Sequence, residues 1–220
     1  MRPWEELARR YDVVESDVQV GDLSLRLARV RDVNVLVDAM TPEDFGPDER
    51  LPYWSALWPA AHDLARHVLT RPPSPGRTIE LGAGLGLVSL AAARRGDRVL
   101  ATDYEADALG FLAHNAALNG LSLDVAEIDY RRWPDGHQGA YTCVLGSDVL
   151  YEARAVEPVA DSVRWLLAPG GEAWIADPGR PHLPSFLTAL AARGLAAERF
   201  PCGPTTLVRV GAVPAASRLD

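Results

Sequence analysis

The stretch Thr78-Ile79-Glu80-Leu81-Gly82-Ala83-Gly84-Leu85-Gly86-Leu87-Val88-Ser89 decides the fold of this chain. Its β-branched start predicts a strand that ends beside an acidic residue, and its apolar end predicts the first turn of a helix. Between them, Gly82, Gly84 and Gly86 stand at every second position. Glycine lets the backbone approach a ligand closely, and a helix N-terminus offers unpaired N–H groups. The stretch therefore predicts a strand, turn and helix that bind a nucleotide-like ligand.

The spacing of these glycines narrows the choice of ligand. A dinucleotide-binding turn has the pattern G-x-G-x-x-G, and its third glycine would fall at position 87, which is Leu87. The observed pattern, G-x-G-x-G, therefore points away from nicotinamide dinucleotides and towards another ligand that contains adenosine.

Strands and helices alternate from residue 78 onwards. The sequence predicts strands at 78–82, 98–103, 122–128, 141–146, 171–176, 195–201 and 205–210, and helices at 85–95, 105–118, 155–167 and 182–193. This alternation is typical of a doubly wound α/β domain, so we expect a Rossmann-like, seven-stranded, mostly parallel sheet. The last two strands follow each other across Cys202-Gly203-Pro204, which predicts an antiparallel hairpin at the edge of the sheet.

The first fifty residues follow a different pattern. Short strands are predicted at 11–14 and 23–30 with Gly21-Asp22 as the turn between them, and residues 31–37 extend or follow this small sheet. The acidic, proline-containing residues 41–48 predict a loop. We expect residues 1–50 to form an N-terminal β extension packed on a main domain at 51–211, followed by a flexible tail at 212–220.

Charge and composition exclude several classes of protein. The net charge of −8 disfavours a nucleic-acid partner, because phosphates bind basic surfaces. No apolar run approaches the ~20 residues that span a bilayer, and the N-terminus has no signal peptide, so we expect a cytoplasmic protein without a membrane partner. The two cysteines and five scattered histidines lack the spacing of metal ligands, so no metal site is expected. The oligomeric state is not determined by the sequence.

Acidic residues end the second and third predicted strands, and ligands bind at the carboxyl ends of strands in such a sheet. Asp103 can accept hydrogen bonds from ribose hydroxyl groups, or it can cap the helix that follows. Asp129 can accept a hydrogen bond from an adenine amine, or it can belong to an acidic turn. Both interpretations of each residue remain open. We expect their neighbours Tyr104 and Tyr130 at the same site.

The residues after the fourth predicted strand would face the reacting group. They read Gly146-Ser147-Asp148-Val149-Leu150-Tyr151, and Asp148 and Tyr151 are spaced to lie on one side of a turn. Asp148 has the alternative role of a helix cap. Trp54 and Trp58 belong to an aromatic segment, residues 52–59, which begins and ends with a proline and precedes the glycine turn. Either they line a ligand pocket or they pack in the core.

Taken together, these features resemble the seven-strand S-adenosylmethionine-dependent methyltransferases. Within that group the chain resembles the branch of protein lysine methyltransferases that includes the enzyme acting on the electron-transfer flavoprotein β subunit. The motifs that carry this second resemblance are Pro52-Tyr53-Trp54, Leu57-Trp58-Pro59-Ala60, Asp148-Val149-Leu150-Tyr151 and Ala176-Asp177-Pro178-Gly179-Arg180-Pro181.

The resemblance implies S-adenosylmethionine as cofactor and a protein that presents a lysine as substrate. The residues expected to bind the cofactor are Trp58, Glu80, Gly82, Gly84, Gly86, Asp103, Tyr104, Asp129, Tyr130 and Ser147. Asp148 and Tyr151 are expected to be catalytic and to shape the channel that receives the lysine. Trp54, Asp177 and Arg180 are expected to line the substrate channel.

Two departures restrict the chemistry further. The fourth predicted strand is followed neither by [Asp/Asn]-Pro-Pro-[Tyr/Phe] nor by a cysteine, which disfavours methylation of amides, of adenine N6 and of cytosine C5. Cys143 lies inside the strand, where we expect a buried, inert thiol. Two other functions remain open, namely a methyltransferase for a small amine or heteroaromatic nitrogen, and a cofactor-binding regulatory protein without catalytic activity.

Overall fold

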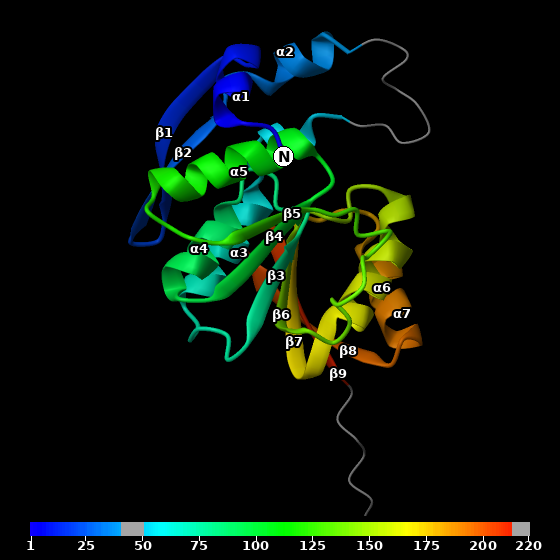
Figure 1. Ribbon diagram of the computed structural model, residues 1–220. Helices are drawn as coiled ribbons and strands as arrows, with labels where there is room; N and C mark the ends of the chain where they lie inside the picture. The colour runs from blue at the N-terminus through cyan, green and yellow to red at the C-terminus, as the bar shows by residue number, and fades with distance from the viewer. Residues whose placement is uncertain (41–50, 213–220) are drawn as a thin grey trace, which may run out of the picture.

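A seven-stranded sheet forms the centre of the computed structural model, which describes residues 1–40 and 51–212 (Figure 1). Its strands are β3 (Arg77–Leu81), β4 (Arg98–Asp103), β5 (Asp124–Glu127), β6 (Tyr141–Ser147), β7 (Leu167–Asp177), β8 (Leu195–Cys202) and β9 (Thr205–Ala212). Their order is β5-β4-β3-β6-β7-β9-β8. Strands β3 to β7 run parallel, whereas β9 is antiparallel to both β7 and β8. The predicted doubly wound sheet with an antiparallel edge is confirmed.

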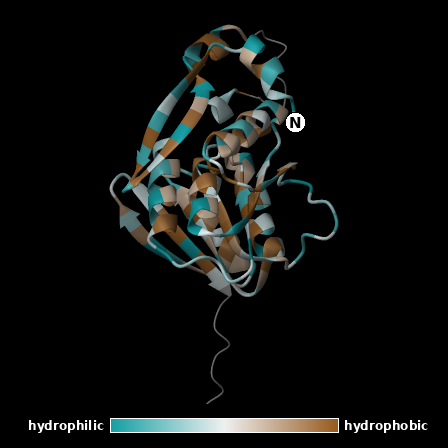
Figure 2. Ribbon diagram, turned by 60° about the vertical axis from the view of Figure 1, so that its left-hand side comes forward, coloured by the Kyte–Doolittle hydropathy of each residue, from teal (hydrophilic) through white to brown (hydrophobic). Residues whose placement is uncertain are grey.

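Helices cover both faces of this sheet (Figure 1). On one face lie α3 (Pro59–Leu69), α4 (Leu87–Arg95) and α5 (Ala106–Leu118), and on the other lie α6 (Val156–Leu166) and α7 (Leu183–Ala192). Two main hydrophobic clusters result, one between the sheet and α3 with α4, and one between the sheet and α6 with α7. Figure 2 shows hydrophobic residues concentrated on the central strands. Because both faces are covered, β3 is buried from Thr78 to Leu81.

The strand order places a switch point at β3. This strand pairs with β4 on one side and with β6 on the other. The next two strands of the chain, β4 and β5, are therefore added on one side of β3, and the strands from β6 onwards are added on the other side. In open α/β sheets, ligands bind outside the carboxyl ends of the strands at such a point. The glycine turn follows β3 directly and therefore lies at this position.

The N-terminal segment contains α1 (Trp4–Arg10), β1 (Val13–Val20), β2 (Leu23–Val30) and α2 (Val33–Asp38). The predicted hairpin with its Gly21-Asp22 turn is confirmed, because Val20 pairs with Leu23. Helix α1 was not predicted. Of the two possibilities for residues 31–37, they follow the small sheet rather than extend it, because the side chain of Asp32 accepts a hydrogen bond from Asn34 N and caps the start of α2.

Some predicted boundaries also differ from the structure. Strand β7 begins at Leu167, before the predicted 171, and a register shift against β6 between Tyr141 and Cys143 accommodates the Pro169-Gly170 pair. The loop predicted at 41–48 and residues 213–220 of the predicted tail lie outside the described residues. Within the described residues, none of the helices combines the length and the apolar character needed to cross a membrane.

Candidate active site

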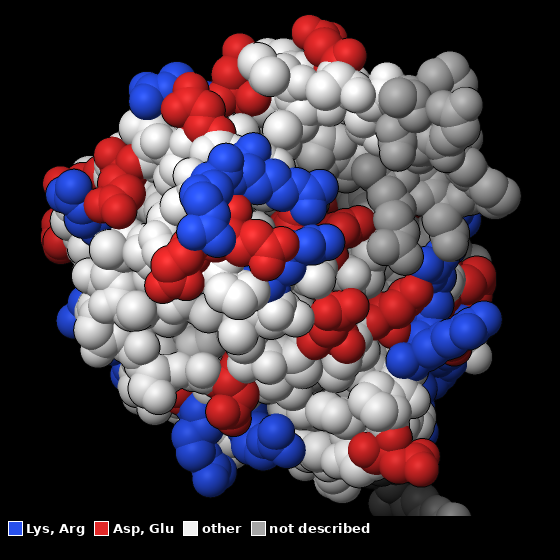
Figure 3. Space-filling model, turned by 45° about the horizontal axis from the view of Figure 1, so that its top comes forward, with Lys and Arg blue, Asp and Glu red and all other residues white. Residues whose placement is uncertain are grey.

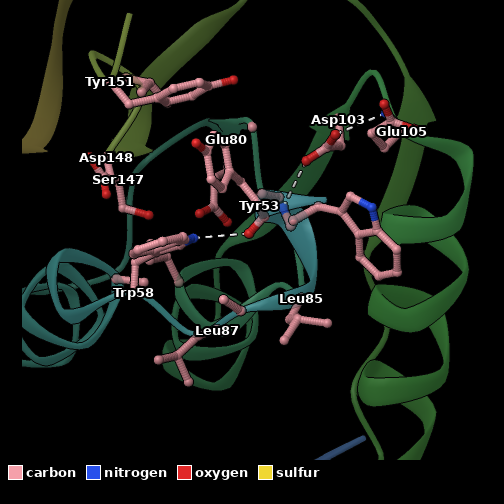
Figure 4. Close-up of a pocket in the computed structure, with 18 of the residues that line it drawn as sticks. Tyr53, Trp58, Glu80, Leu85, Leu87, Asp103, Glu105, Ser147, Asp148 and Tyr151 are labelled. Atoms are coloured by element: carbon pink, nitrogen blue, oxygen red, sulfur yellow. Dashed lines mark hydrogen bonds between the residues drawn. The ribbon is translucent and has the colours of Figure 1, made fainter. Parts of the chain in front are cut away.

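A cavity of about 330 Å³ lies at the carboxyl ends of β3, β4 and β6 (Figure 4). Its volume is in the range of small-molecule sites. The predicted site residues that line it are Trp54, Trp58, Glu80, Gly82, Gly84, Gly86, Asp103, Tyr104, Tyr130, Ser147, Asp148, Tyr151 and Arg180. Residues from six separate parts of the sequence therefore converge on one cavity.

The glycine turn approaches its surroundings too closely for a larger residue at two positions. A Cβ atom on Gly84 would lie 3.1 Å from the carbonyl oxygen of Trp54, and Gly84 has a φ of +52°. A Cβ atom on Gly86 would lie 2.6 Å from Cγ of Leu112 on α5. Gly86, with a φ of +87°, also precedes the first residue of α4. The turn is thus enclosed by the aromatic segment on one side and by α5 on the other.

Asp103 links the glycine turn to the start of α5. Its Oδ2 accepts a hydrogen bond from Gly84 N and its Oδ1 accepts one from Glu105 N, both at 2.9 Å (Figure 4). The residue is 5% exposed, and burial raises the pKa of its carboxyl group. Asp103 is not the N-cap of α5, because that position is Glu105 and no side chain caps this helix; its bond to Glu105 N forms a turn just before α5. Ribose binding through the remaining lone pairs stays a prediction.

Glu80 places a second buried carboxyl group at the base of the cavity. Ser89 Oγ donates a hydrogen bond to its Oε2. Burial raises the pKa of Glu80 to about 8, although the bonds to Ser89 oppose this, and the nearby Asp103 raises it further. The group is therefore mainly protonated at neutral pH, and a cation bound in the cavity would favour its ionised form.

Asp148 is held in a bidentate ion pair at the opposite side of the cavity. Nε and Nη2 of Arg180 donate to its two carboxylate oxygens, each at 2.8 Å. This bond is also the main cause that raises the pKa of the Arg180 guanidinium. Asp148 has a φ of +54°, and its N–H donates to Ala176 O on β7. The pairing fixes the carboxylate in one orientation, which the sequence did not predict.

Three aromatic rings, those of Tyr53, Trp58 and Tyr151, form one wall of the cavity near Asp148 (Figure 4). The ring centroid of Tyr53 lies 5.4 Å from that of Tyr151 and 5.8 Å from that of Trp58. Trp58 Nε1 donates to Tyr53 O at 2.9 Å, which holds this segment folded over the cavity. Burial raises the pKa of Tyr104 to about 12 and that of Tyr151 further, so both phenols stay neutral.

The predicted site residues omit several residues that line the cavity, among them Tyr53, Glu105 and Glu152. Each of these three had a detectable signal, because it is adjacent to a residue that was selected. Trp54 contributes differently from the expectation. Its ring packs on Tyr11 and Phe111, and its carbonyl group faces Gly84. The core interpretation therefore holds for the Trp54 ring, although the residue also borders the cavity.

Asp129 and Asp177 are not among the residues that line the main cavity. Arg131 Nε donates to both carboxylate oxygens of Asp129, which lines a smaller neighbouring cavity; the two cavities share Tyr104, Tyr130, Tyr151 and Glu152. Asp177 is fully buried, and its Oδ1 accepts hydrogen bonds from the backbone N–H groups of residues 179 and 180. It therefore shapes the loop that carries Arg180. Local ion pairing and turn formation explain both outcomes.

A metal site would require several His, Cys, Asp or Glu side chains that lie close together. Across residues 1–40 and 51–212, no three His, Cys, Asp or Glu side chains are grouped so that they could hold a metal ion. Burial raises the pKa of the Cys143 thiol to about 12, as expected for an inert buried cysteine. On the face in Figure 3, acidic and basic side chains are interspersed rather than separated into regions of one sign.

Comparison with known proteins identifies relatives of this arrangement. A family model described as lysine methyltransferase matches residues 55–182, which is more than half of the chain. Protein N-lysine methyltransferase METTL21A of Danio rerio is 41% identical over 81 residues, which cover 34% of this chain and 37% of that protein. Ubiquinone biosynthesis O-methyltransferase of Burkholderia thailandensis is 27% identical over 130 residues, covering 59% and 56%. Each match thus spans less than two thirds of the relative.

Solved structures agree with the fold. A 16S rRNA N2 methyltransferase of T. Thermophilus (RsmC), in complex with AdoMet and guanosine, superposes with a TM-score of 0.67 at 14% identity, covering 91% of this chain and 51% of that one. The glycopeptide N-methyltransferase MtfA, complexed with sinefungin, superposes with a TM-score of 0.55 at 18% identity, covering 68% and 92%. At this level of identity the likeness concerns the fold alone.

Proposed function

This chain belongs to the lysine methyltransferase family, and we propose that it transfers a methyl group from S-adenosylmethionine to the side-chain amine of a lysine in a protein. The observation that carries the proposal is the single cavity that joins the glycine turn to Asp148 and Tyr151. A cofactor held at the first end and an amine entering at the second would meet inside it.

The residues at the glycine end fit S-adenosylmethionine. Three glycines of the turn line the cavity and put no side chain into it, Asp103 offers carboxylate lone pairs, and Glu80 offers a buried carboxyl group that a cation would ionise. When bound, S-adenosylmethionine supplies an electrophilic methyl group. We propose that the glycine turn holds the methionine part of the cofactor and that Asp103 holds its ribose.

The aromatic wall would prepare the acceptor amine. A lysine amine has an ordinary pKa of about 10.4 and must lose a proton before it can attack a methyl group. The rings of Tyr53, Trp58 and Tyr151 would displace water around an amine bound between them, and desolvation favours the neutral amine. Positioning and desolvation then account for much of the rate, since the leaving group is already a good one.

Asp148 would orient that amine. Its carboxylate is held by two bonds from Arg180, so it can accept a hydrogen bond from the amine without moving. We assign it orientation rather than strong general-base work, because a carboxylate beside an amine also favours the charged ammonium form. Arg180 in turn acts by fixing Asp148.

The acceptor could also be a small molecule. The alignment with an O-methyltransferase of ubiquinone biosynthesis extends over more of the chain than the alignment with the N-lysine enzyme. This observation favours a small acceptor as the second candidate. Among proteins, the β subunit of electron-transfer flavoprotein is the first to test, because its methyltransferase is the one that the motifs around Trp58 and Asp148 resemble.

Transfer of tritium from labelled S-adenosylmethionine distinguishes these acceptors. The full chain would be incubated with a hypomethylated lysate, and the label followed in protein bands and in the small-molecule fraction. Label on lysine in one protein band supports the proposal. Label only in small molecules supports the second candidate. Failure to bind S-adenosylhomocysteine would remove both enzymatic candidates, whereas binding without any transfer would favour the non-catalytic, cofactor-binding interpretation.

The organisation of the chain enters this proposal as well. We propose that residues 1–50 form an extension of a catalytic domain at 51–211, with a tail at 212–220, in a cytoplasmic protein. The contacts of β2 and α1 with α5 support the first part.

A further inference from the structure

Strand β2 presents an open edge to helix α5. In the β1–β2 hairpin, the backbone groups of Arg26 and Ala28 point away from β1, because they occupy non-hydrogen-bonded pairs with Asp17 and Glu15. An exposed edge of this kind normally requires a partner. Figure 1 shows the hairpin lying alongside α5, at the side of the molecule where α1 also lies.

Two asparagines of α5, one helical turn apart, occupy this edge. Asn115 Oδ1 accepts from Ala28 N at 2.8 Å, and Asn115 Nδ2 donates to Ala28 O at 3.2 Å. Asn119 repeats the arrangement with Arg26, at 2.9 Å for the N–H group and 2.7 Å for the carbonyl group. Each carboxamide thus pairs with β2 as the peptide of a neighbouring strand would.

Asn115 makes one contact that Asn119 does not make. Its Nδ2 also donates to the carbonyl oxygen of Leu85 at 3.0 Å, and Leu85 stands between the second and third glycines of the turn. Asn115 is fully buried, so no water can replace these three bonds. One side chain therefore joins the hairpin to the glycine turn.

The side chain of Leu85 is held from the same direction. It is buried in a cluster with Leu7 of α1, Ala28 and Val30 of β2, and Phe111 of α5. The side chain of Leu85 therefore packs against the N-terminal extension directly, whereas its carbonyl group is linked to the extension through Asn115 of α5.

We propose that Asn115 is a positioning residue through which the N-terminal hairpin holds the glycine turn in its ligand-binding conformation. The extension is then part of the cofactor site rather than a lid or a separate docking surface for the acceptor. A turn with three glycines can adopt many conformations when it is free. Bonds that restrict it beforehand reduce the entropy that the ligand would otherwise have to remove. This inference rests on the proposed function for the identity of the ligand.

Two matched substitutions in the full chain distinguish positioning of the glycine turn by Asn115 from mere attachment of the hairpin to α5. Asn115→Ser removes the bond to Leu85 and the pairing with Ala28, whereas Asn119→Ser removes only pairing at the hairpin and within α5. By isothermal titration with S-adenosylhomocysteine, Asn115→Ser is expected to bind about tenfold more weakly than the wild type, and Asn119→Ser within about twofold. Equal losses in the two variants, or no loss in either, would overturn the proposal.

Amide hydrogen exchange provides a readout that does not depend on ligand. In the free proteins, exchange at residues 84–87 should be faster in Asn115→Ser than in the wild type, and unchanged in Asn119→Ser, after correction for global stability. Unchanged exchange at this turn in both variants contradicts the proposal. This comparison stands even if the wild type fails to bind S-adenosylhomocysteine, an outcome that would refute the proposed function separately.

The wild type alone tests the coupling if Asn115→Ser does not fold. Coupling between two sites is reciprocal, so S-adenosylhomocysteine should slow exchange of the Ala28 amide, which donates to Asn115. We expect at least about threefold slower exchange at Ala28. If the ligand slows amide exchange at residues 84–87 but leaves exchange at Ala28 unchanged, the hairpin does not hold the glycine turn in place and the proposal is wrong.

Discussion

The buried carboxyl group of Glu80 is expected to make this protein less stable as the pH rises from about 5 to about 8. The residue is 1% exposed, and burial raises its pKa to about 8 in the folded protein, against an ordinary value of 4.5. A group whose pKa is raised on folding stabilises the protein fully below its unfolded pKa. That contribution is lost as the pH rises through its folded pKa.

The size of the effect follows from the two pKa values. At a pH between the pKa of Glu80 in the unfolded chain and its pKa in the folded protein, each rise of one pH unit lowers the free energy of unfolding by up to about 1.4 kcal/mol. Raising the pH from about 5 to about 7 should therefore cost about 3 kcal/mol through Glu80 alone. Glu80→Gln removes this titration and keeps a side chain of the same shape beside Ser89, so the free energy of unfolding of the variant should lack this decline.

Denaturant unfolding of both proteins across this pH range measures the difference. The free energy of the variant minus that of the wild type should grow with pH and level off above the folded pKa of Glu80. Glu198→Gln serves as the control, because it removes a carboxylate that is 64% exposed and solvated in both states. Parallel pH profiles for wild type and Glu80→Gln would refute the assignment of a buried, proton-bearing carboxyl group.

Three further outcomes test the site itself. Gly84→Ala should weaken S-adenosylhomocysteine binding at least about tenfold in isothermal titration, whereas Gly120→Ala, with a φ of +61° in open space, should lose about 1 kcal/mol of stability and keep its affinity. Asp103→Asn should weaken the same binding about tenfold and Asp129→Asn less than about twofold, so equal effects would contradict the proposed cofactor contacts. Asp148→Asn should lower kcat about 100-fold with an identified acceptor and leave cofactor affinity intact, and near-wild-type turnover would remove its proposed role.

Local sequence patterns determined most of the fold. The glycine turn at 82–86, the alternation of strands and helices, and the Gly21-Asp22 hairpin all depend on residues a few positions apart, so they could be predicted directly. The differences from the predicted elements have local causes too. Asp32 begins a helix through its own side chain, and the register shift against β6 lets β7 continue through Pro169-Gly170.

Only the tertiary structure decided the partners of the charged and amide side chains. Asp148 and Arg180 are 32 residues apart, and Asn115 reaches back 87 residues to Ala28. Such pairs depend on where helices and strands pack, and a carboxylate or carboxamide bonds to whichever complementary group lies within about 3 Å. Asp129 and Asp177, by contrast, bond to groups only two or three residues away. The sequence by itself therefore determined which strand ends form the candidate site. Packing decided which side chains line its cavity and that the N-terminal hairpin contacts the glycine turn.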